Sequence, residues 1–180
     1  MRALLLFLFT ALAAFAQDAR RPEKYARPVE SLNIPNLHQV TPQLFRSAQP
    51  WPEGFREIEK MGIRTVICLR DDGGDDEFAV GTKLKLINVP MGLDAVNPAA
   101  VAKVLALLQK KEDGPFLVHC RAGIDRTGVV MAAWRITSQG WTREDAIAEM
   151  HACGLEIEAF ATWVATADLT KVQPAPPKAK

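Results

Sequence analysis

The chain of 180 residues has almost no excess charge of either sign, with 22 Lys and Arg against 21 Asp and Glu. Proteins that bind nucleic acids or membrane surfaces need a clustered positive field. The balance therefore argues against both classes, and we expect no nucleic-acid partner.

Long apolar runs are also scarce. One lies at the start, "MRALLLFLFTALAAFA", where a single basic residue precedes an apolar stretch that ends at Ala14-Phe15-Ala16. The run is shorter than the roughly 20 residues that a spanning helix needs, and its small-x-small ending is typical of a signal peptidase site. We therefore predict that residues 1–16 are a removed signal peptide. The mature protein is then expected to be periplasmic or secreted, with no stable membrane insertion.

Cysteine is rare, with only Cys68, Cys120 and Cys153. An odd number in a chain expected in an oxidising compartment leaves at least one thiol unpaired. Such a thiol is either buried and inert or used in chemistry. For Cys68 we favour burial over a role as resolving partner of Cys120. Cys153 is expected to be structural, with a bridge to Cys68 as the alternative.

Proline and charge gather at both ends of the chain, without apolar periodicity. Residues 17–35 are predicted to be an N-terminal arm, and residues 171–180 a proline-rich tail. Residues 36–170 between them suffice for one domain.

Within that domain, short apolar runs alternate with helical patterns. Strands are predicted at residues 43–48, 63–69, 84–90 and 115–120. Helices are predicted at residues 52–62, 126–140, 142–154 and 156–169, with another beginning after the cap Asn97-Pro98. This alternation predicts an α/β fold, a single domain with a mainly parallel central sheet flanked by helices on both faces. The functional site of such a fold lies at the carboxyl ends of the strands.

One segment, "VHCRAGIDRTGVV" at residues 118–130, joins a strand to a helix through a cysteine. Cys120 ends the strand, residues 121–125 form a tight loop, and Arg126 opens the helix. Backbone N–H groups of the loop and the helix N-terminus then form an anion cradle. Gly123 and Gly128 leave room where the chain must turn or pack closely.

This cradle predicts nucleophilic chemistry. A thiol in its positive field has a lowered pKa, so Cys120 is expected to be a thiolate at neutral pH. Arg126 can offer two parallel N–H donors to a phosphate group. Thr127 can donate its hydroxyl to the thiolate when sulfur becomes the leaving group.

The pattern His119-Cys120-x-x-Gly123-x-x-Arg126-Thr127-Gly128 resembles the HCxxGxxR[ST]G signature of the cysteine-dependent protein tyrosine and dual-specificity phosphatases. Three further segments, "NLHQVTPQLFRSAQP", "GIRTVICLR" and "GWTREDAIAEM", look like the corresponding parts of compact bacterial and plant-fungal atypical dual-specificity phosphatases. The resemblance covers roughly residues 33–165, and it implies a protein tyrosine phosphatase-like fold.

The resemblance also implies a two-step mechanism without a metal or organic cofactor. Cys120 attacks phosphorus, a cysteinyl-phosphate forms, and water releases phosphate. Arg126 clamps the phosphate, Thr127 assists the thiolate, and His119 orders the loop. The implied phosphate-binding residues are Arg121, Ala122, Gly123, Ile124, Asp125 and Arg126.

Two aspartates compete for the role of the general acid that protonates the leaving group. Asp94 lies on the loop after the strand at residues 84–90, where many relatives keep this acid. Asp125 lies inside the cradle, as in myotubularin-like and some secreted bacterial relatives. We lean to Asp125, because a carboxylate inside an anion cradle repels the substrate unless it has a function. The alternatives are that Asp94 is an ordinary loop residue before a helix cap, and that Asp125 pairs with Arg121 or with a helix N-terminus.

The acidic run "DDGGDDE", Asp71 to Glu77, lacks the spacing of a calcium loop and is predicted to be a solvated surface loop. Arg70 precedes it at a strand end. Arg70 is expected either to attract phosphate to the site or to pair with this run, and the sequence does not favour one over the other.

The sequence predicts a cysteine-dependent phosphomonoester hydrolase of the tyrosine or dual-specificity type. Its substrate is expected to be a phosphorylated protein or a small phosphomonoester. Two alternatives stay open: a phosphatase of inositol phosphates or phosphoinositides, and a catalytically silent phosphate-binding module.

Overall fold

The computed structural model describes residues 21–172. The predicted signal peptide and almost all of the predicted tail lie outside this range. Among the described residues, no helix has the length and apolar character needed to cross a membrane.

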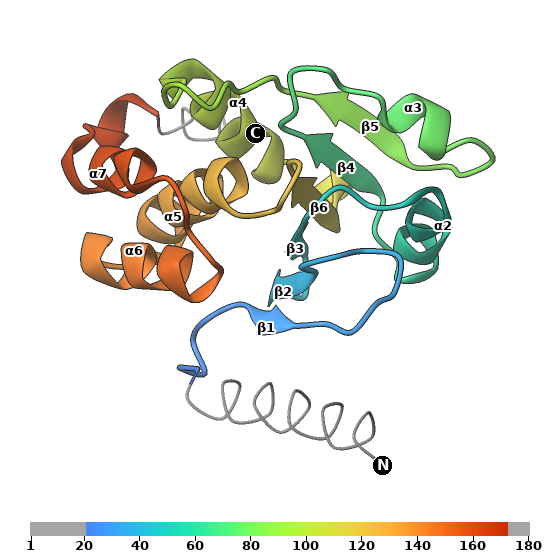
Figure 1. The fold of residues 1–180 in the computed structure, drawn as a ribbon, viewed down its shortest axis with the longest axis horizontal. Coiled ribbons are helices and arrows are strands. Elements are labelled where there is room, and N and C mark those ends of the chain that lie inside the picture. The colour runs from blue at the N-terminus through green and yellow to red at the C-terminus, as the bar shows by residue number, and fades with distance from the viewer. Residues whose placement is uncertain (1–20, 173–180) are drawn as a thin grey trace, which may run out of the picture.

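A sheet with strand order β1-β2-β3-β6-β4-β5 forms the centre of the molecule (Figure 1). Its strands are β1 (Arg27–Pro28), β2 (His38–Thr41), β3 (Leu44–Ser47), β4 (Thr65–Cys68), β5 (Lys85–Asn88) and β6 (Phe116–His119). The four strands β3, β6, β4 and β5 are parallel, and β1 and β2 add an antiparallel edge. The predicted, mainly parallel sheet is thus confirmed.

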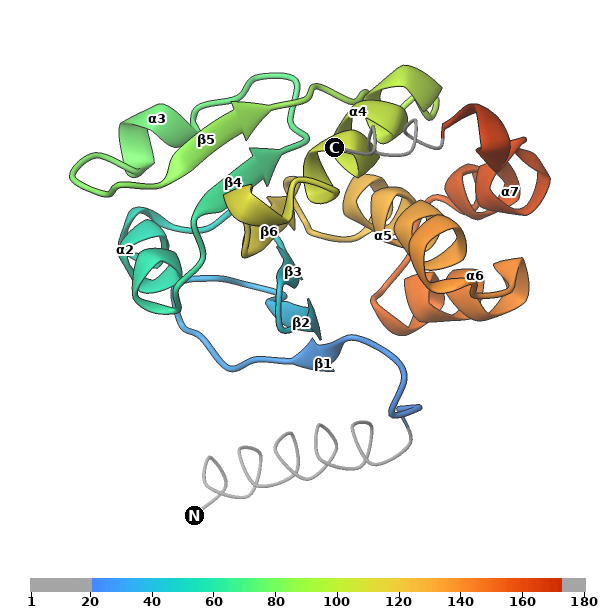
Figure 2. The ribbon, with the colours of Figure 1, turned by 180° about the vertical axis from the view of Figure 1, so that it is seen from behind.

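Helices cover both faces of this sheet, as predicted (Figure 2). They are α2 (Pro52–Lys60), α3 (Asp75–Phe78), α4 (Pro98–Leu108), α5 (Asp125–Gln139), α6 (Arg143–Ala152) and α7 (Glu158–Thr166), with 3-10 turns at Lys111–Asp113 and Leu169–Lys171. Local signals set several boundaries: the Asn97 side chain caps α4, the Thr142 side chain caps α6, and Gly140 ends α5 with a φ of 69°.

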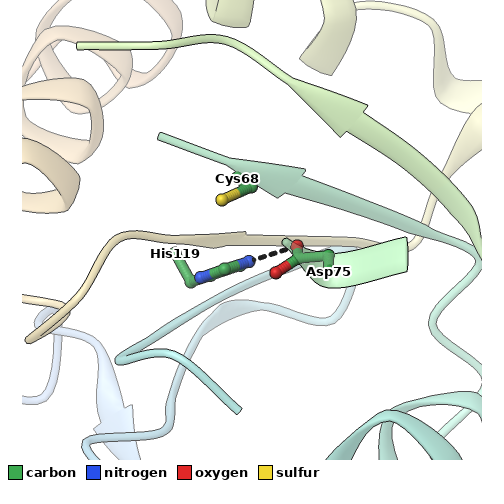
Figure 3. Close-up of side chains that lie close together, drawn as sticks. All are labelled: Cys68, Asp75 and His119. Atoms are coloured by element: carbon green, nitrogen blue, oxygen red, sulfur yellow. Dashed lines mark hydrogen bonds and ion pairs between the residues drawn. The ribbon is translucent and has the colours of Figure 1, made fainter. Parts of the chain in front are cut away.

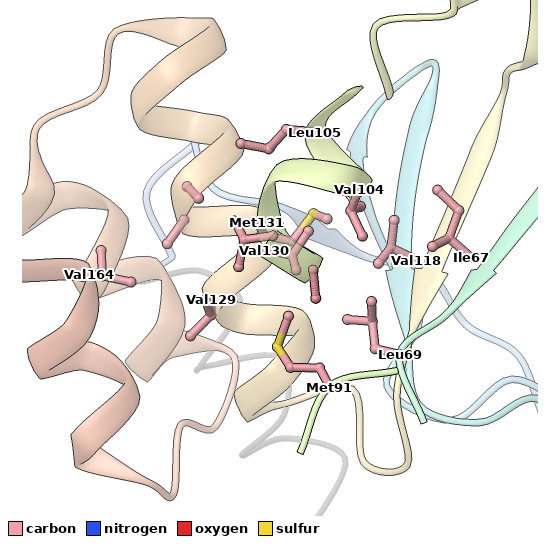
Figure 4. Packing of buried hydrophobic residues seen from close by; sticks show 14 of the residues in the cluster. Ile67, Leu69, Met91, Val104, Leu105, Val118, Val129, Val130, Met131 and Val164 are labelled. Atoms are coloured by element: carbon pink, nitrogen blue, oxygen red, sulfur yellow. The ribbon is translucent and has the colours of Figure 1, made fainter. Parts of the chain in front are cut away.

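The alternation of side chains along the central strands separates two apolar layers. Ile67 and Val118 belong to the larger layer, which includes residues of α4, α5, α6 and α7 (Figure 4). Val66 and Leu117, one position before each, belong to the smaller layer against α2. Strands β4 and β6 are therefore buried throughout, which explains why their sequences have so few polar residues.

Part of the predicted N-terminal arm joins the sheet. β1 pairs with β2, and the backbone N–H of Ala26 donates to Glu149 Oε1 at 2.7 Å. Glu149 in turn forms a buried ion pair with Arg135 of α5 at 2.7 Å. These contacts tie the arm to the helical layer.

All three cysteines are free and buried. The bridge between Cys68 and Cys153, weighed as an alternative from the sequence, is not present. Cys68 ends β4, and Cys153 follows α6.

Candidate active site

The nucleophile candidate Cys120 directly follows β6, in the middle of the parallel strands. Pairing in register places His119 between Ser47 of β3 and Cys68 of β4. Cys120 is 2% exposed, and the backbone N–H of Gly123 donates to its Sγ at 3.3 Å. The structure thus places the thiol at the base of the loop that leads into α5.

The carbonyl groups of residues 121–123 accept hydrogen bonds from donors outside the loop. The backbone N–H of Gln49 donates to the first at 3.0 Å, and the Asn36 side chain to the second at 3.1 Å. The buried guanidinium of Arg46 donates to the third at 2.6 Å. Because these carbonyls face β3 and the segment before β2, the N–H side of the loop is available to an anion.

Gly123 allows this close approach to β3. Its φ is 71°, and a Cβ at this position would lie 2.4 Å from the backbone N of Ala48 and 2.5 Å from the carbonyl oxygen of Ser47. Only glycine fits both conditions. A Cβ on Gly128 would meet Met150 only at 3.6 Å, an ordinary contact, so the expectation of close packing is weaker there.

Arg126, in the first turn of α5, is 6% exposed. Its Nη1 donates to the carbonyl of Met91 at 3.2 Å, and Asp71 Oδ2 lies 3.8 Å from the same nitrogen. Its Nε has no hydrogen-bond partner among the described residues. The guanidinium is therefore held in place and keeps a donor for a phosphate oxygen.

The thiol of Cys120 is electrostatically activated. Burial raises its pKa, but the neighbouring hydroxyl and backbone N–H of Thr127, the N–H of Gly123 and the charge of Arg126 outweigh burial and lower it. The Thr127 hydroxyl is buried and has no hydrogen-bond partner among residues 21–172. The direction of this pKa shift agrees with the thiolate that the sequence predicts at Cys120.

His119 lies behind the loop in a buried ion pair (Figure 3). Its Nε2 is 2.8 Å from Asp75 Oδ2, and its Nδ1 is 3.2 Å from the carbonyl oxygen of Cys120. Donor atoms of Cys68, Asp75 and His119 lie within 4.8 Å of one another, the one such group in the described range. Nε2 bonds directly to the carboxylate, so His119 and Asp75 form an ion pair.

Asp125 has a structural function at a helix N-terminus, which was the alternative to its role as the acid. Its Oδ1 accepts hydrogen bonds from the backbone N–H groups of Glu156 and Ile157, both at 2.9 Å, directly before α7. The sequence favours Asp125 as the general acid only if a carboxylate in the cradle must serve catalysis. The structure removes that argument, because the carboxylate links the start of α5 to the start of α7.

Asp94 is exposed on the segment between β5 and α4. The same segment carries Met91, which is buried and accepts the hydrogen bond from Arg126. Asp94 thus lies three residues after Met91, the residue that contacts Arg126. Its carboxylate has no hydrogen-bond or ion-pair partner among the described residues.

The acidic run is only partly the solvated loop that we predicted. Asp75 is 5% exposed, belongs to α3 and accepts a hydrogen bond from Gln49 at 3.0 Å. Asp72 is exposed and holds Arg70 through two hydrogen bonds of 2.8 and 2.5 Å. Of the two roles open to Arg70, pairing with this run is the one that the structure shows.

Comparison with known proteins agrees with this geometry. A family model described as "PTP-NADK: DSP-PTPase phosphatase fused to NAD+ Kinase" matches residues 27–166. The chain belongs to this phosphatase family. Its membership confirms the resemblance to the cysteine-dependent protein tyrosine and dual-specificity phosphatases.

Curated relatives match this chain over only part of their own length. The dual specificity protein phosphatase TpbA of Pseudomonas aeruginosa (strain UCBPP-PA14) is 36% identical over 121 residues, which are 66% of this chain and 55% of that protein. The putative tyrosine-protein phosphatase OCA1 of Yarrowia lipolytica is 28% identical over 123 residues, which are 63% of this chain and 48% of that protein. The chain spans about half the length of these curated relatives.

Solved structures show the same fold. The crystal structure of P. aeruginosa TpbA has a TM-score of 0.76 and 30% identity, over 85% of this chain and 96% of that chain. A variant of TpbA in complex with pTyr gives a TM-score of 0.76 at 29% identity, with the same coverage. The catalytic domain of the PP-IP phosphatase SIW14 from S. cerevisiae has a TM-score of 0.69 at 21% identity, over 77% and 89% of the two chains, and shows the fold alone.

Four residues that build the candidate site were missed in the sequence: Asn36, Arg46, Gln49 and Asp75. Arg46 carried a usable signal, because an arginine inside a short apolar strand is rarely buried without a function. Asn36 and Gln49 act from loops, and no local pattern marks a residue that bonds a loop 70 or more positions away.

Proposed function

We propose that this protein hydrolyses phosphomonoesters, and phosphotyrosine in proteins above all, through a cysteinyl-phosphate intermediate. The observation that carries the proposal is the buried Cys120 thiol, with its lowered pKa, in a loop whose N–H groups and Arg126 are arranged for an anion. The family membership and the TpbA structures support the same activity.

In the first step, a phosphate ester lies over the cradle with its non-bridging oxygens bound by loop N–H groups and Arg126. The Cys120 thiolate attacks phosphorus in line with the leaving oxygen. The S–P bond forms as the P–O bond to the leaving group breaks. A carboxylic acid transfers its proton to that leaving oxygen, so no alkoxide or phenoxide is expelled.

In the second step, the same carboxylate takes a proton from a water molecule that attacks phosphorus. The O–P bond forms, the S–P bond breaks, and the electron pair returns to Cys120. The N–H of Gly123, which already donates to the sulfur, and the neighbouring Thr127 hydroxyl stabilise the thiolate as it leaves. Inorganic phosphate is released, and the acid is protonated again.

We assign the acid to Asp94. It lies three residues after Met91, whose carbonyl contacts Arg126, and its side chain is exposed and has no hydrogen-bond or ion-pair partner among the described residues. Asp125, by contrast, already holds the start of α7.

The charges at the mouth favour a monoester over a polyphosphate. Arg121, 77% exposed, is the additional basic residue of the loop, and Asp72 Oδ2 lies 3.8 Å from it. Asp72 also holds Arg70, and Asp71 faces Arg126. An inositol polyphosphate needs a broad basic mouth, and here acidic side chains accompany the basic ones.

The test is a set of pH–rate profiles with a small aryl phosphate for the reduced protein, Cys120→Ser, Asp94→Asn and Asp125→Asn. We expect Cys120→Ser to abolish turnover. Asp94→Asn should lower the rate about a hundredfold and remove the basic limb of the profile, because a general acid contributes at least that much. Tight binding of vanadate without any turnover by the wild type would refute the hydrolase and leave a phosphate-binding module.

We further propose that the protein is exported to the periplasm or secreted. The proposal is supported by the signal-like residues 1–16, which end in Ala14-Phe15-Ala16. Fractionation of cells that express the full chain, with the N-terminus read by mass spectrometry, tests it. A mature protein that begins at Gln17 outside the cytoplasm is expected, and an uncleaved cytoplasmic chain contradicts it.

A further inference from the structure

A buried pair of charges lies directly behind the nucleophile. Asp75 is 5% exposed, His119 is fully buried, and the two side chains are 2.8 Å apart (Figure 3). Burying a carboxylate is unfavourable unless it is paired. The position of Asp75, on a four-residue helix that contributes little else to the site, therefore requires an explanation.

The hydrogen bonds of His119 define its charge. Nδ1 faces the carbonyl oxygen of Cys120, and Nε2 faces the carboxylate of Asp75. A carbonyl and an ionised carboxylate only accept hydrogen bonds, so both ring nitrogens must carry a hydrogen. His119 is thus a cation one residue from the reactive sulfur.

The surrounding groups maintain this charge. Gln49 donates to the other oxygen of Asp75, and Arg70 adds positive charge on the same side. Cys68, at the end of β4, faces the pair from the neighbouring strand. Burial alone lowers the pKa of His119, but the hydrogen bond and charge of Asp75, together with Cys68, raise it to about 10.

We propose that Asp75 is a positioning residue for the reaction: through His119, it fixes the carbonyl of Cys120 and keeps a positive charge beside the thiolate. The inference rests on the proposed role of Cys120 as nucleophile. Asp75 does not touch the phosphate. Arg126 supplies the other nearby cation, from the substrate side of Cys120.

Loss of the Asp75 charge has a defined consequence. Without the carboxylate, burial dominates, and His119 becomes neutral near neutral pH. The thiolate then loses a neighbouring cation. The Cys120 carbonyl also loses a fixed donor, because a neutral ring can carry its hydrogen on either nitrogen. The pKa of the Cys120 thiol rises, and less thiolate is present at a given pH.

The experiment measures the rate of Cys120 alkylation by iodoacetamide against pH, with the modified residue identified by mass spectrometry. The variants are Asp75→Asn, Asp75→Glu and the matched control Asp76→Asn, an exposed aspartate of the same helix. In Asp75→Asn we expect the midpoint to rise by about one pH unit, which makes alkylation about tenfold slower below it. Asp76→Asn should follow the wild type, and Asp75→Glu should recover part of the shift. Superimposable profiles for Asp75→Asn and Asp76→Asn overturn the proposal.

A measurement on the wild type guards against a variant that fails to fold. Nitrogen-15 NMR of the His119 ring at pH 7 is expected to show both nitrogens protonated, and a neutral ring there overturns the proposal. Neither experiment requires turnover. A protein that hydrolyses no phosphate ester would disprove the proposed function, and the alkylation profile would still decide the role of Asp75.

Discussion

At the scale of single residues, the cradle depends on backbone geometry as much as on charge. Gly123 has a positive φ and lies against the backbone of β3, and its N–H reaches the sulfur of Cys120. The backbone conformation at Gly123 therefore also sets the position of the N–H that binds the sulfur. A side chain at that position therefore disturbs the donor nearest to the nucleophile.

Gly123→Ala is accordingly expected to lower both stability and activity. The strained φ and the contact with Ser47 together should reduce the free energy of unfolding by about 2 kcal/mol or more. Displacement of the N–H should also raise the pKa of the Cys120 thiol. Urea unfolding and kcat/KM with an aryl phosphate measure the two effects.

Gly140→Ala is the matched control. Gly140 has a φ of 69°, similar to Gly123, but a Cβ at this position would point into open space. The variant isolates the backbone strain, so we expect a stability loss of about 1 kcal/mol with unchanged kcat/KM. Equal losses of activity in the two variants would contradict the role assigned to the contact with β3.

Asp72 gives a second prediction at this scale. Asp72→Asn releases Arg70 and Arg121 from their carboxylate partner. Because exposed ion pairs contribute only up to about 1 kcal/mol, the affinity for inositol hexakisphosphate as an inhibitor should rise about two- to fivefold. The affinity for inorganic phosphate should change less. Inhibition constants at low and high salt test this, and a rise for both anions alike would contradict selection by charge at the mouth.

At the scale of elements, Asp125 joins α5 to α7. Asp125→Ala removes both hydrogen bonds to residues 156 and 157, and we expect the free energy of unfolding to fall by about 1–2 kcal/mol. Asp125→Asn keeps an acceptor oxygen and should lose less. Urea unfolding of both variants measures which of them loses more free energy of unfolding.

The pH–rate profile distinguishes a structural role of Asp125 from a role as the general acid. If it is structural, Asp125→Asn keeps the basic limb of the pH–rate profile that Asp94→Asn loses. An Asp125→Asn variant of wild-type stability that lacks this limb would restore Asp125 as the acid.

Elements with strong periodicity or clear caps could be predicted from the sequence, and others could not. Strands β4 and β6 and helices α4 and α5 lie close to their predicted ranges, because burial and capping leave marks in nearby residues. Helix α3 has four residues in an acidic run, too short for any period. Strands β1 and β2 have only two and four residues, which are too few to show a clear alternation in the sequence.

The same distinction applies to the site. Cys120, Arg126 and Thr127 lie within eight residues, and their spacing alone indicated an anion cradle around a thiol. Asp75 meets His119 across 44 residues, and Asp125 meets the start of α7 across more than 30. Only the fold shows which acidic side chain each of these contacts uses.

At the scale of the whole molecule, buried titrating groups make stability depend on pH in both directions. The pKa of His38 is lowered to about 4 by burial, so its contribution is lost as pH falls below 6.5 toward that value. The pKa of His119 is raised to about 10, so its contribution is complete below 6.5 and is lost as pH rises toward 10. The Cys120 thiol, with a lowered pKa, acts in the opposite sense to His119 at alkaline pH.

The contribution of His119 can be isolated in Cys120→Ser, where the thiol no longer titrates. Between pH 7 and pH 9 the folded protein keeps the proton on His119, and the unfolded chain has lost it. The free energy of unfolding should then fall with pH by about 1.4 kcal/mol per unit, the slope for one proton. Adding Asp75→Asn to this background should lower the slope by that amount, because His119 is then neutral in both states. Urea unfolding at pH 7, 8 and 9 measures it, and equal slopes in the two proteins would show that Asp75 does not hold the proton on His119.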